Sequence, residues 1–419
     1  MQDIFLFFNL ALDNLTAKLN IQNVMKIRFI LFTILSVLIG GCSNIEEPAF
    51  TDKSINDSDA VRNRFTISQA EGIASSIIAE FSNESVTRTS DSTPDVEIIL
   101  RSSKTRSQSS NDTLAYVFNY PDNGGFVIMS PDPKLEDPLV AYSDKGHINT
   151  SDDFVKTQIF NPLEYYIETI PSYTSTRVVL PGGNYHIVYD VLEWLSPQII
   201  ISLDQDAPWN KVVTAKLGNG YLAGCVPVAA ALVMSRCKDS FSLRGKNYNF
   251  KEITKCIAIN QGVSGLGTTK YSYEQAVNEM AQLLWDLGQE FDAKYIVDRT
   301  GADSTKAVPM IINWGFASPF STYKYNYTAD ILKTYLETNN VIYVTGNREN
   351  SGHAWVCDGY QVRRNKSAIS GIVFPSVTYV HMNWGLGGWC DGYFSGSIYT
   401  PVDGYTYEAN LYCPFKINY

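Results

Sequence analysis

The sequence has few histidines, no closely paired cysteines and no excess of positive charge. It holds four histidines in 419 residues, and its net charge is -10 with a pI near 5.0. A nucleic-acid binder needs a basic stripe that neutralises phosphates, so this composition argues against a nucleic-acid partner. The seven cysteines form no C-x-x-C pair, so neither a disulfide framework nor a zinc site is indicated. We therefore predict no metal and no cofactor.

A long apolar run is also missing at the N-terminus. Met25 begins a short basic stretch, and the apolar residues 29–39 that follow are too few to span a bilayer comfortably. This segment ends in Leu-Ile-Gly-Gly-Cys42-Ser, which resembles the lipobox of bacterial lipoproteins, where the cysteine is acylated. Residues 1–42 are thus predicted to be an N-terminal extension and a lipoprotein signal peptide, with Met25 as the start. An ordinary secretory signal with a coincidental cysteine is the alternative.

The next segments predict a tether and a small α+β domain. Residues 43–64 are polar and cannot bury enough apolar surface to fold alone. Residues 65–81 carry apolar side chains at helical spacing, and residues 96–100, 114–120, 125–130 and 139–143 are typical of strands separated by turns. We place this domain at residues 65–180 and find no catalytic constellation in it.

Residues 185–419 predict a second, larger α+β domain. One helix begins at Cys225, and another covers residues 272–287 with a possible capping box formed by Ser272 and Gln275. A third helix, residues 328–338, precedes strands at 341–345, 353–362, 371–384 and 407–417. Helices first and antiparallel strands later indicate an α+β arrangement. This half shows no internal repeat.

Cys225 stands where a glycine-rich loop ends and a helix of small apolar residues begins. Free N–H groups and the helix dipole at such a position stabilise a thiolate, and with a cationic partner they lower a thiol pKa from about 8.5 to about 3.5–7.5. A lone cysteine of this kind is more often a packed apolar residue. A nucleophile therefore needs a base elsewhere in the chain.

His353 is the preferred base because it follows a glycine at the start of a predicted strand. His353 and Asn383 follow Cys225 at about the 130 to 150 residues by which His and Asn follow Cys in papain-like enzymes. His381 is the rival, since it lies two residues before Asn383 and shares its strand face. Trp355 and Cys357 share the face of His353 and are predicted to be core.

Three motifs together resemble the streptopain family of bacterial cysteine proteases, peptidase family C10. They are Gly-Cys-Val at the helix start, Gly-His-Ala-Trp-Val-x-Asp-Gly-Tyr, and Asn-Trp-Gly-x-Gly-Gly-x-x-Asp-Gly-Tyr-Phe. The resemblance implies a papain-like catalytic domain at residues 185–419, made as a zymogen with residues 65–180 as inhibitory prodomain. It implies Cys225 as nucleophile, His353 as base, Asn383 as the group that orients the imidazole, and Trp384 as its shield from water.

The same resemblance suggests the remaining site residues. Gln205 is expected to complete the oxyanion hole with the Cys225 N–H, although a plain surface glutamine is the alternative. Gly352 is expected to contact substrate through its backbone, and Ser304 lies in a polar loop predicted to line a substrate pocket. Leu386 departs from the tryptophan usual in this family, which affects the shape of a neighbouring pocket.

The predicted function is a secreted, lipid-anchored cysteine endopeptidase zymogen of the bacterial cell envelope or surface. Its expected partners are protein or peptide substrates, its own propeptide as inhibitor, and a membrane reached through the lipid on Cys42. Two alternatives stay open: a surface lipoprotein that keeps the fold as a binding or inhibitory module without turnover, and an amidase or peptidoglycan peptidase with the same Cys-His chemistry.

Overall fold

The computed structural model describes residues 65–82, 93–102, 113–135, 137–170, 187–316, 324–325, 327–348, 351–367, 373–399 and 409–417. We call residues 65–170 the N-terminal region and residues 187–417 the C-terminal region. The predicted signal segment, Cys42 and the tether lie outside the described residues. Among the described helices, none is long and apolar enough to cross a bilayer.

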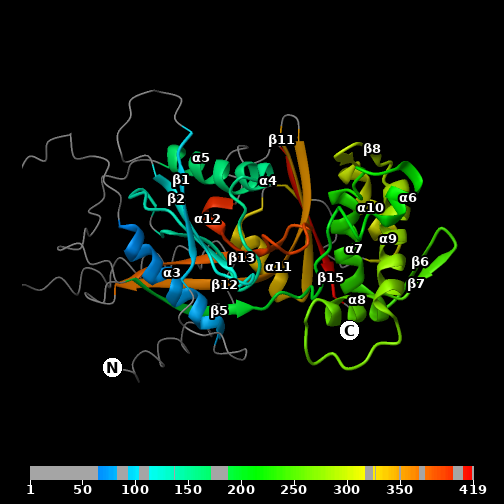
Figure 1. Cartoon of the computed structure of the whole chain (residues 1–419), viewed down its shortest axis with the longest axis horizontal. Helices are drawn as coiled ribbons and strands as arrows, with labels where there is room; N and C mark the ends of the chain where they lie inside the picture. Colours follow the sequence, from blue (N-terminus) through cyan, green and yellow to red (C-terminus); the bar gives the residue numbers. More distant parts are fainter. Residues whose placement is uncertain are drawn as a thin grey trace, which may run out of the picture. The chain divides into compact units, whose positions relative to one another are not determined.

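The N-terminal region combines four strands with helices at its two ends (Figure 1). Its elements are α3 (Ile67–Ser82), β1 (Asp95–Leu100), β2 (Thr113–Asn119), β3 (Phe126–Met129), β4 (Leu139–Ser143), α4 (Asp153–Val155), a π-helical stretch (Lys156–Phe160) and α5 (Asn161–Thr169). These bounds agree with the predicted helix and strands to within a few residues. The alternation of apolar residues along the strands and their helical spacing in α3 explain that agreement.

The C-terminal region begins with a strand, continues through helices and ends in long strands. Its first elements are β5 (Ile187–Leu195), α6 (Lys211–Leu217), α7 (Cys225–Cys237), β6 (Phe241–Leu243), β7 (Lys246–Tyr248), α8 (Phe250–Asn260), α9 (Tyr273–Glu290), β8 (Lys294–Ile296), β9 (Arg299–Gly301) and α10 (Ser304–Asn313). The later ones are β10 (Lys324–Tyr325), α11 (Ala329–Glu337), β11 (Asn340–Arg348), β12 (Ser351–Ser367), β13 (Val373–Asn383), β14 (Gly392–Ser395), α12 (Gly396–Tyr399) and β15 (Ala409–Lys416).

The predicted start of α9 is half right. The Ser272 hydroxyl accepts the Gln275 N–H at 3.1 Å, as an N-cap should. The Gln275 side chain does not reach back to complete the capping box, because it donates to Glu279 one turn further along the helix, at 3.1 Å. The cap therefore rests on the serine alone.

One sheet runs through both regions. Within the described residues its order is β1-β2-β3-β4-β14-β13-β12-β11-β15-β10, and β5 pairs with β12. The junction is the antiparallel pair β4 and β14, where Tyr142 lies opposite Tyr393 and Ala141 opposite Phe394. The two domains expected from the sequence are therefore joined by backbone pairing, which composition and periodicity did not reveal.

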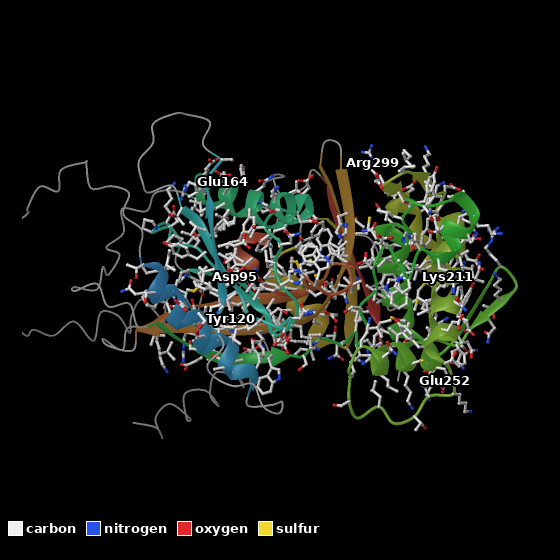
Figure 2. All side chains as sticks on the ribbon, in the orientation of Figure 1. Asp95, Tyr120, Glu164, Lys211, Glu252 and Arg299 are labelled. Carbon is white, nitrogen blue, oxygen red and sulfur yellow. The ribbon has the colours of Figure 1, made fainter. Side chains whose placement is uncertain are left out.

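The two faces of the sheet carry different packing. On β11 and β12, Tyr343 and Val356 face the core built with helices α7 to α10, while Val344 and Trp355 face the other side. That second core also takes in buried residues of β2, β3, β4 and α5. Because successive strand residues alternate between faces, one strand serves both cores. Figure 2 shows Asp95, Tyr120 and Glu164 on the N-terminal region, and Lys211, Glu252 and Arg299 on the helical part of the C-terminal region.

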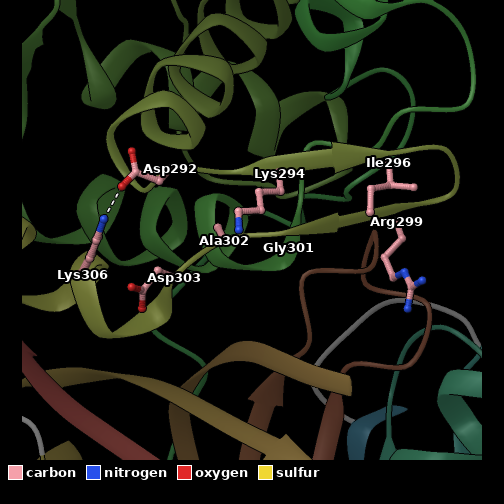
Figure 3. A pocket seen from close by; sticks show the side chains of 8 residues that line it. All are labelled: Asp292, Lys294, Ile296, Arg299, Gly301, Ala302, Asp303 and Lys306. Atoms are coloured by element: carbon pink, nitrogen blue, oxygen red, sulfur yellow. Dashed lines mark hydrogen bonds and ion pairs between the residues drawn. The ribbon is translucent and has the colours of Figure 1, made fainter. Parts of the chain in front are cut away.

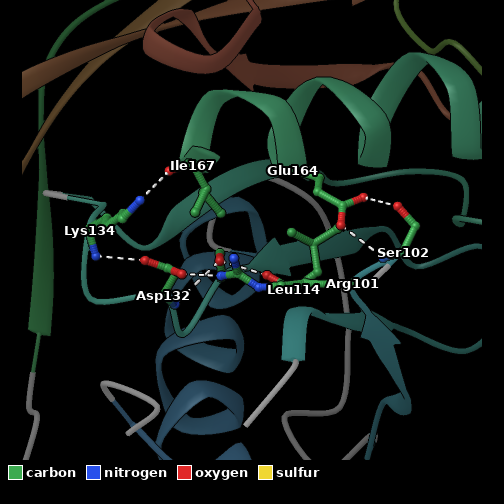
Figure 4. A network of polar contacts seen from close by, with 8 residues as sticks. Arg101, Ser102, Leu114, Asp132, Lys134, Glu164 and Ile167 are labelled. Carbon is green, nitrogen blue, oxygen red and sulfur yellow. Dashed lines mark hydrogen bonds and ion pairs between the residues drawn. The ribbon is translucent and has the colours of Figure 1, made fainter. Parts of the chain in front are cut away.

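Polar contacts fix α5 on the N-terminal region (Figure 4). The Glu164 carboxylate accepts the Ser102 N–H at 2.8 Å and the Ser102 hydroxyl at 2.6 Å, just after β1. Lys134 donates to the Ile167 carbonyl at 3.0 Å near the end of the helix. Since α4 and the π-helical stretch lead directly into α5, these contacts also fix the position of α4.

Candidate active site

Cys225 is the first residue of α7 and its side chain is partly exposed. Gly224 precedes it with φ 95°, and an added Cβ there would lie 2.9 Å from the Thr300 methyl group. The turn that presents the thiol at the helix start therefore requires glycine. The Ala354 N–H faces the sulfur from β12, next to His353.

A short segment links the loop before Cys225 to the loop after β13. The Gln205 carbonyl accepts the Ala223 N–H at 2.7 Å, and the Leu203 carbonyl accepts the Gly387 N–H at 2.8 Å. This backbone hydrogen bond joins Gln205 to Ala223, which lies two residues before the start of α7. The structure brings together Cys225, Gln205 and the glycine loop that follows Asn383.

His353 is buried on β12 opposite Gly346. Its Nε2 atom lies 2.9 Å from the Trp384 carbonyl oxygen, and its ring contacts Trp355 at 6.0 Å and Trp384 at 6.1 Å between centroids. No described hydrogen bond joins this imidazole to the Cys225 thiol. Cys225 and His353 are neighbours through Ala354, but the imidazole is engaged elsewhere.

Asn383 and Trp384 end β13 beside these residues. The Asn383 carboxamide donates to the Ile201 carbonyl at 3.4 Å and accepts the Gly385 N–H at 3.2 Å. It therefore holds its own loop in this structure, and no described bond connects it to His353. The Trp384 ring is buried, and its centroid lies 6.1 Å from that of the imidazole.

Phe154 of α4 reaches the site from the N-terminal region. Its ring meets the His353 ring edge-on, with centroids 4.9 Å apart, and the Trp384 ring at 5.5 Å. The Asp152 carboxylate caps α4 by accepting the Phe154 N–H at 2.7 Å. A helix of the N-terminal region thus packs an aromatic ring directly on the candidate base.

This packing favours the neutral forms of both reactive groups. Burial raises the pKa of the Cys225 thiol more than the N–H of Ala354 lowers it. Burial also lowers the pKa of His353 to about 4, against a smaller opposing effect of its bond to Trp384. At neutral pH the site therefore holds a thiol and an uncharged imidazole. A thiolate-imidazolium pair, which thiol proteases use, is disfavoured in this state.

His381 lies in a different environment from His353. Its Nδ1 atom is 2.6 Å from the buried Asp358 carboxylate, at the point where a bulge interrupts the pairing of β12 with β13. Burial lowers the pKa of His381, but Asp358 and other nearby carboxylates together raise it by a larger amount, so the net shift is upward. The described contacts of His381 are with Asp358 and Tyr393, and none is with Cys225.

Asp391 supports the loop that carries Trp384. Its carboxylate accepts the Trp384 N–H at 2.8 Å, and burial raises its pKa to about 7. It stands inside the third sequence motif, but the motif alone predicted no role for it. The role of Phe154 was not predicted from the sequence, because an aromatic residue in a short helix carries no signal that separates it from an ordinary core residue.

The two predicted substrate-binding positions lie on different elements, β12 and α10. Gly352 is exposed on β12 just before His353. Ser304 begins α10, shortly after the strand β9 whose Thr300 hydroxyl donates to the Leu222 carbonyl at 2.7 Å. A cavity of about 560 Å³ opens beside the hairpin formed by β8 and β9. Arg299 is among its lining residues (Figure 3), whereas Ser304 does not line it.

No group of acidic, histidine and cysteine side chains among the described residues has the arrangement of a metal site. Asp358 and Asp391, the carboxylates nearest to His381, are already engaged by protein donors. The carboxylates of Asp358 and Asp391 are therefore explained by contacts within the chain.

Comparison with known proteins identifies both regions. Residues 203–394 match the Peptidase C10 family, and residues 61–165 match the family named Spi protease inhibitor. Streptopain of Streptococcus pyogenes is 28% identical over 312 residues, which cover 67% of this chain and 73% of streptopain. The chain is therefore similar to the cysteine proteases of peptidase family C10. It is a streptopain-like cysteine endopeptidase precursor with a papain-like α+β fold and an N-terminal prodomain.

Two solved structures of the C10 group are also similar to this chain. A fragment of prointerpain A from Prevotella intermedia is 19% identical, covers 76% of this chain and 98% of its own, and has a TM-score of 0.48. Active interpain A from the same organism is 22% identical, covers 52% of this chain and 94% of its own, and has a TM-score of 0.34.

Proposed function

We propose that Cys225 and His353 are the nucleophile and the base of this endopeptidase, and that the described structure is its latent form. One observation carries the proposal: the Cys225 sulfur at the start of α7 faces the Ala354 N–H, beside His353, and Asn383 and Trp384 end the adjacent strand. Three separate elements, α7, β12 and β13, carry these residues.

The proposed reaction follows from this arrangement. Once the imidazole turns from the Trp384 carbonyl to the thiol, His353 takes the thiol proton and the thiolate attacks a peptide carbonyl. The Cys225 N–H and the Gln205 carboxamide stabilise the oxyanion, and protonated His353 gives its proton to the leaving amine. Water then hydrolyses the thioester, with His353 again as base. Asn383 orients the imidazole in this working state.

Phe154 explains the latency. Its ring occupies the face of His353 and adds to the burial that keeps the imidazole neutral. An imidazole with a lowered pKa, whose Nε2 is bonded to a carbonyl instead of the thiol, is a poor base for Cys225 and supplies no positive charge to stabilise a thiolate. The N-terminal region therefore acts as an inhibitory prodomain through α4, and cutting within residues 171–186, between the two described regions, would allow it to leave.

The export and anchoring of the chain are a further part of this proposal. Their support is the lipobox-like sequence before Cys42, which would place the zymogen on the bacterial cell envelope or surface. Fatty-acid incorporation in expressing cells should be lost in a Cys42→Ser chain. Incorporation that persists in that variant would contradict the anchor.

An active-site titration tests the proposed nucleophile and base. After removal of the prodomain, an epoxide thiol inhibitor should label Cys225 in preference to the buried thiols such as Cys413. His353→Ala should lower kcat/KM for casein peptides by about 10²–10⁴-fold while the fold is kept. Labelling of another cysteine, or full activity in a His353→Ala chain, would overturn the assignment.

Casein and cell-wall peptides should be compared in the same assay. Hydrolysis of casein in preference to cell-wall peptides supports the endopeptidase. The reverse preference would support the amidase or peptidoglycan peptidase. A purified chain that hydrolyses neither and behaves like its Cys225→Ala variant would support the binding lipoprotein.

A further inference from the structure

A buried arginine of the protease is closed in by the prodomain. Arg363 lies on β12 with 1% of its side chain exposed, and its Nε donates to the Tyr142 hydroxyl at 2.9 Å. Its Nη2 atom is 3.0 Å from the Glu80 carboxylate of α3, and its guanidinium lies 4.4 Å from the centre of the Tyr142 ring. Within the protease, Gln361 accepts a second bond from Nε at 2.9 Å. The ion-pairing carboxylate and the ring therefore come from the prodomain.

A buried carboxylate of the prodomain makes the complementary contact. Asp137, just before β4, is buried and accepts hydrogen bonds from the hydroxyls of Tyr189 at 2.6 Å and Tyr379 at 3.0 Å. Tyr189 lies on β5 and Tyr379 on β13, so both donors belong to the protease. Tyr379 also donates to the Leu139 carbonyl of the prodomain at 3.1 Å.

Both contacts become unfavourable when one partner is absent. A buried charge that loses its partner is strongly destabilised, and a buried donor that loses its acceptor keeps its desolvation cost. A segment with an apolar or cationic side chain in place of Glu80 or Asp137 would bind this face poorly for the same reason. The protease face formed by Arg363, Tyr189 and Tyr379 therefore recognises two carboxylates at a set spacing.

This face is remote from the inhibitory contact. Arg363 follows His353 by ten residues on β12, which at about 3.3 Å per residue separates them by roughly 30 Å along the strand. Phe154, which touches His353, belongs to α4, whereas Glu80 belongs to α3 and Asp137 precedes β4. Among the described contacts, none joins Glu80 or Asp137 to Cys225 or His353.

We propose that Arg363, Tyr189 and Tyr379 form a recognition site for the carboxylates of Glu80 and Asp137, which supplies prodomain affinity, whereas Phe154 supplies inhibition. The proposal rests on the proposed function in treating the N-terminal region as the inhibitor. The occupant is the propeptide of this chain itself. After the connecting segment is cut, this site keeps the propeptide bound until a competing event removes it.

The test measures affinity without catalysis. A Cys225→Ala full-length chain receives the target sequence of a site-specific protease between Ser172 and His186 and is then cut. The dissociation constant of the two pieces is measured by gel filtration at decreasing concentration. Glu80→Gln and Asp137→Asn should each raise it at least about tenfold. Glu71→Gln, on the same helix α3 but close to Tyr120 of the prodomain, should leave it within about twofold.

A double-mutant cycle identifies the partner of Glu80. Arg363→Gln alone should weaken binding, and adding Glu80→Gln to it should weaken binding little more, because the pair is already lost. Tyr379→Phe, which keeps the ring, tests the Asp137 contact if Asp137→Asn fails to fold. Independent effects of Glu80→Gln and Arg363→Gln, or unchanged affinity in both carboxylate variants, would overturn the proposal.

A second readout separates affinity from inhibition. In the uncut chain with Cys225 intact, Glu80→Gln should leave the rate of thiol labelling unchanged, because the connecting segment holds Phe154 in place. Faster labelling in that variant would show that the two functions are not separate. Since the affinity experiment uses a chain without the nucleophile, failure of the proposed catalytic roles would not alter its result.

Discussion

His353 has a hydrogen bond and three aromatic neighbours, and none of them helps it act as a base. The Trp384 carbonyl engages Nε2, while Phe154 and two tryptophans surround the ring. Burial among apolar rings disfavours the imidazolium, which explains the pKa of about 4. The latent state of the enzyme is thus visible in the environment of a single side chain.

Replacing Phe154 with Ala should release this imidazole. Water and conformational freedom then raise the pKa of His353 toward its ordinary range, and the imidazole can pair with the thiol. We expect Cys225 in the uncut precursor to react with iodoacetamide at neutral pH at least about ten times faster than in the unmodified precursor. In the unmodified precursor labelling should rise only in the alkaline range, since burial raises the pKa of its thiol above the ordinary value for cysteine.

Lys156→Ala is the matched control for this experiment. Lys156 lies two residues further along and its side chain is half exposed, so its loss should leave the labelling rate unchanged. Equal labelling of the Phe154→Ala chain and the unmodified precursor across the pH range would show that the ring does not cause the latency.

At the scale of elements, the start of α7 depends on the strand β9 that packs against it. Gly224 adopts φ 95° and ψ 143°, and Thr300 lies directly over it. The same threonine bonds the loop at Leu222, so hairpin, loop and helix start form one unit. Local sequence predicts the helix and its glycine, while the close approach of Thr300 depends on how the hairpin folds back.

Gly224→Ala should therefore destabilise the protease for two reasons. The backbone conformation costs an alanine about 1–3 kcal/mol, and the new methyl group meets Thr300. Gly218 has a similar φ of 107°, but the space around an added Cβ there is open. Gly218→Ala therefore reports the backbone cost alone. Thermal unfolding should show a larger loss for Gly224→Ala than for Gly218→Ala. Equal losses would mean that the loop moves away from Thr300 freely.

At the scale of the whole molecule, prodomain and protease share both a sheet and a core. Tyr142 of β4 stacks on Tyr393 of β14 with centroids 5.3 Å apart, and meets Tyr379 edge-on at 5.3 Å. Buried residues of α3, such as Ile77, belong to the same cluster as these protease tyrosines. A prodomain core completed by protease side chains is not expected to be stable by itself.

We expect the Cys225→Ala precursor to unfold in one cooperative transition by calorimetry. Because the shared core is lost in a single step, the calorimetric and van't Hoff enthalpies should agree. After cutting between residues 171 and 186, the midpoint should become dependent on protein concentration, as for any two bound pieces. Two separate transitions in the uncut chain would contradict this picture.

The predicted elements agree with the structure where the information is local. The helices at Cys225 and Ser272, the strand of His353 and the order of the three motifs all follow from side-chain periodicity and residue type over short windows. The pairing of β4 with β14, the bulge at Asp358 that gives His381 a carboxylate partner, and the approach of Phe154 involve residues far apart in the chain. Periodicity carries no information on such contacts.

The sequence by itself determined which residues are suited to thiol-protease chemistry: a cysteine at a helix start, a histidine behind a glycine, and an Asn-Trp pair on a strand. Only the tertiary structure decided the state of these groups, because a pKa depends on burial and on charges brought close by folding. Burial beside Phe154 keeps the His353 ring neutral, and the carbonyl of Trp384 occupies its Nε2 atom. Folding likewise brings the carboxylate of Glu80 and the hydroxyl of Tyr142 to the buried Arg363. No local sequence pattern links these residues to it.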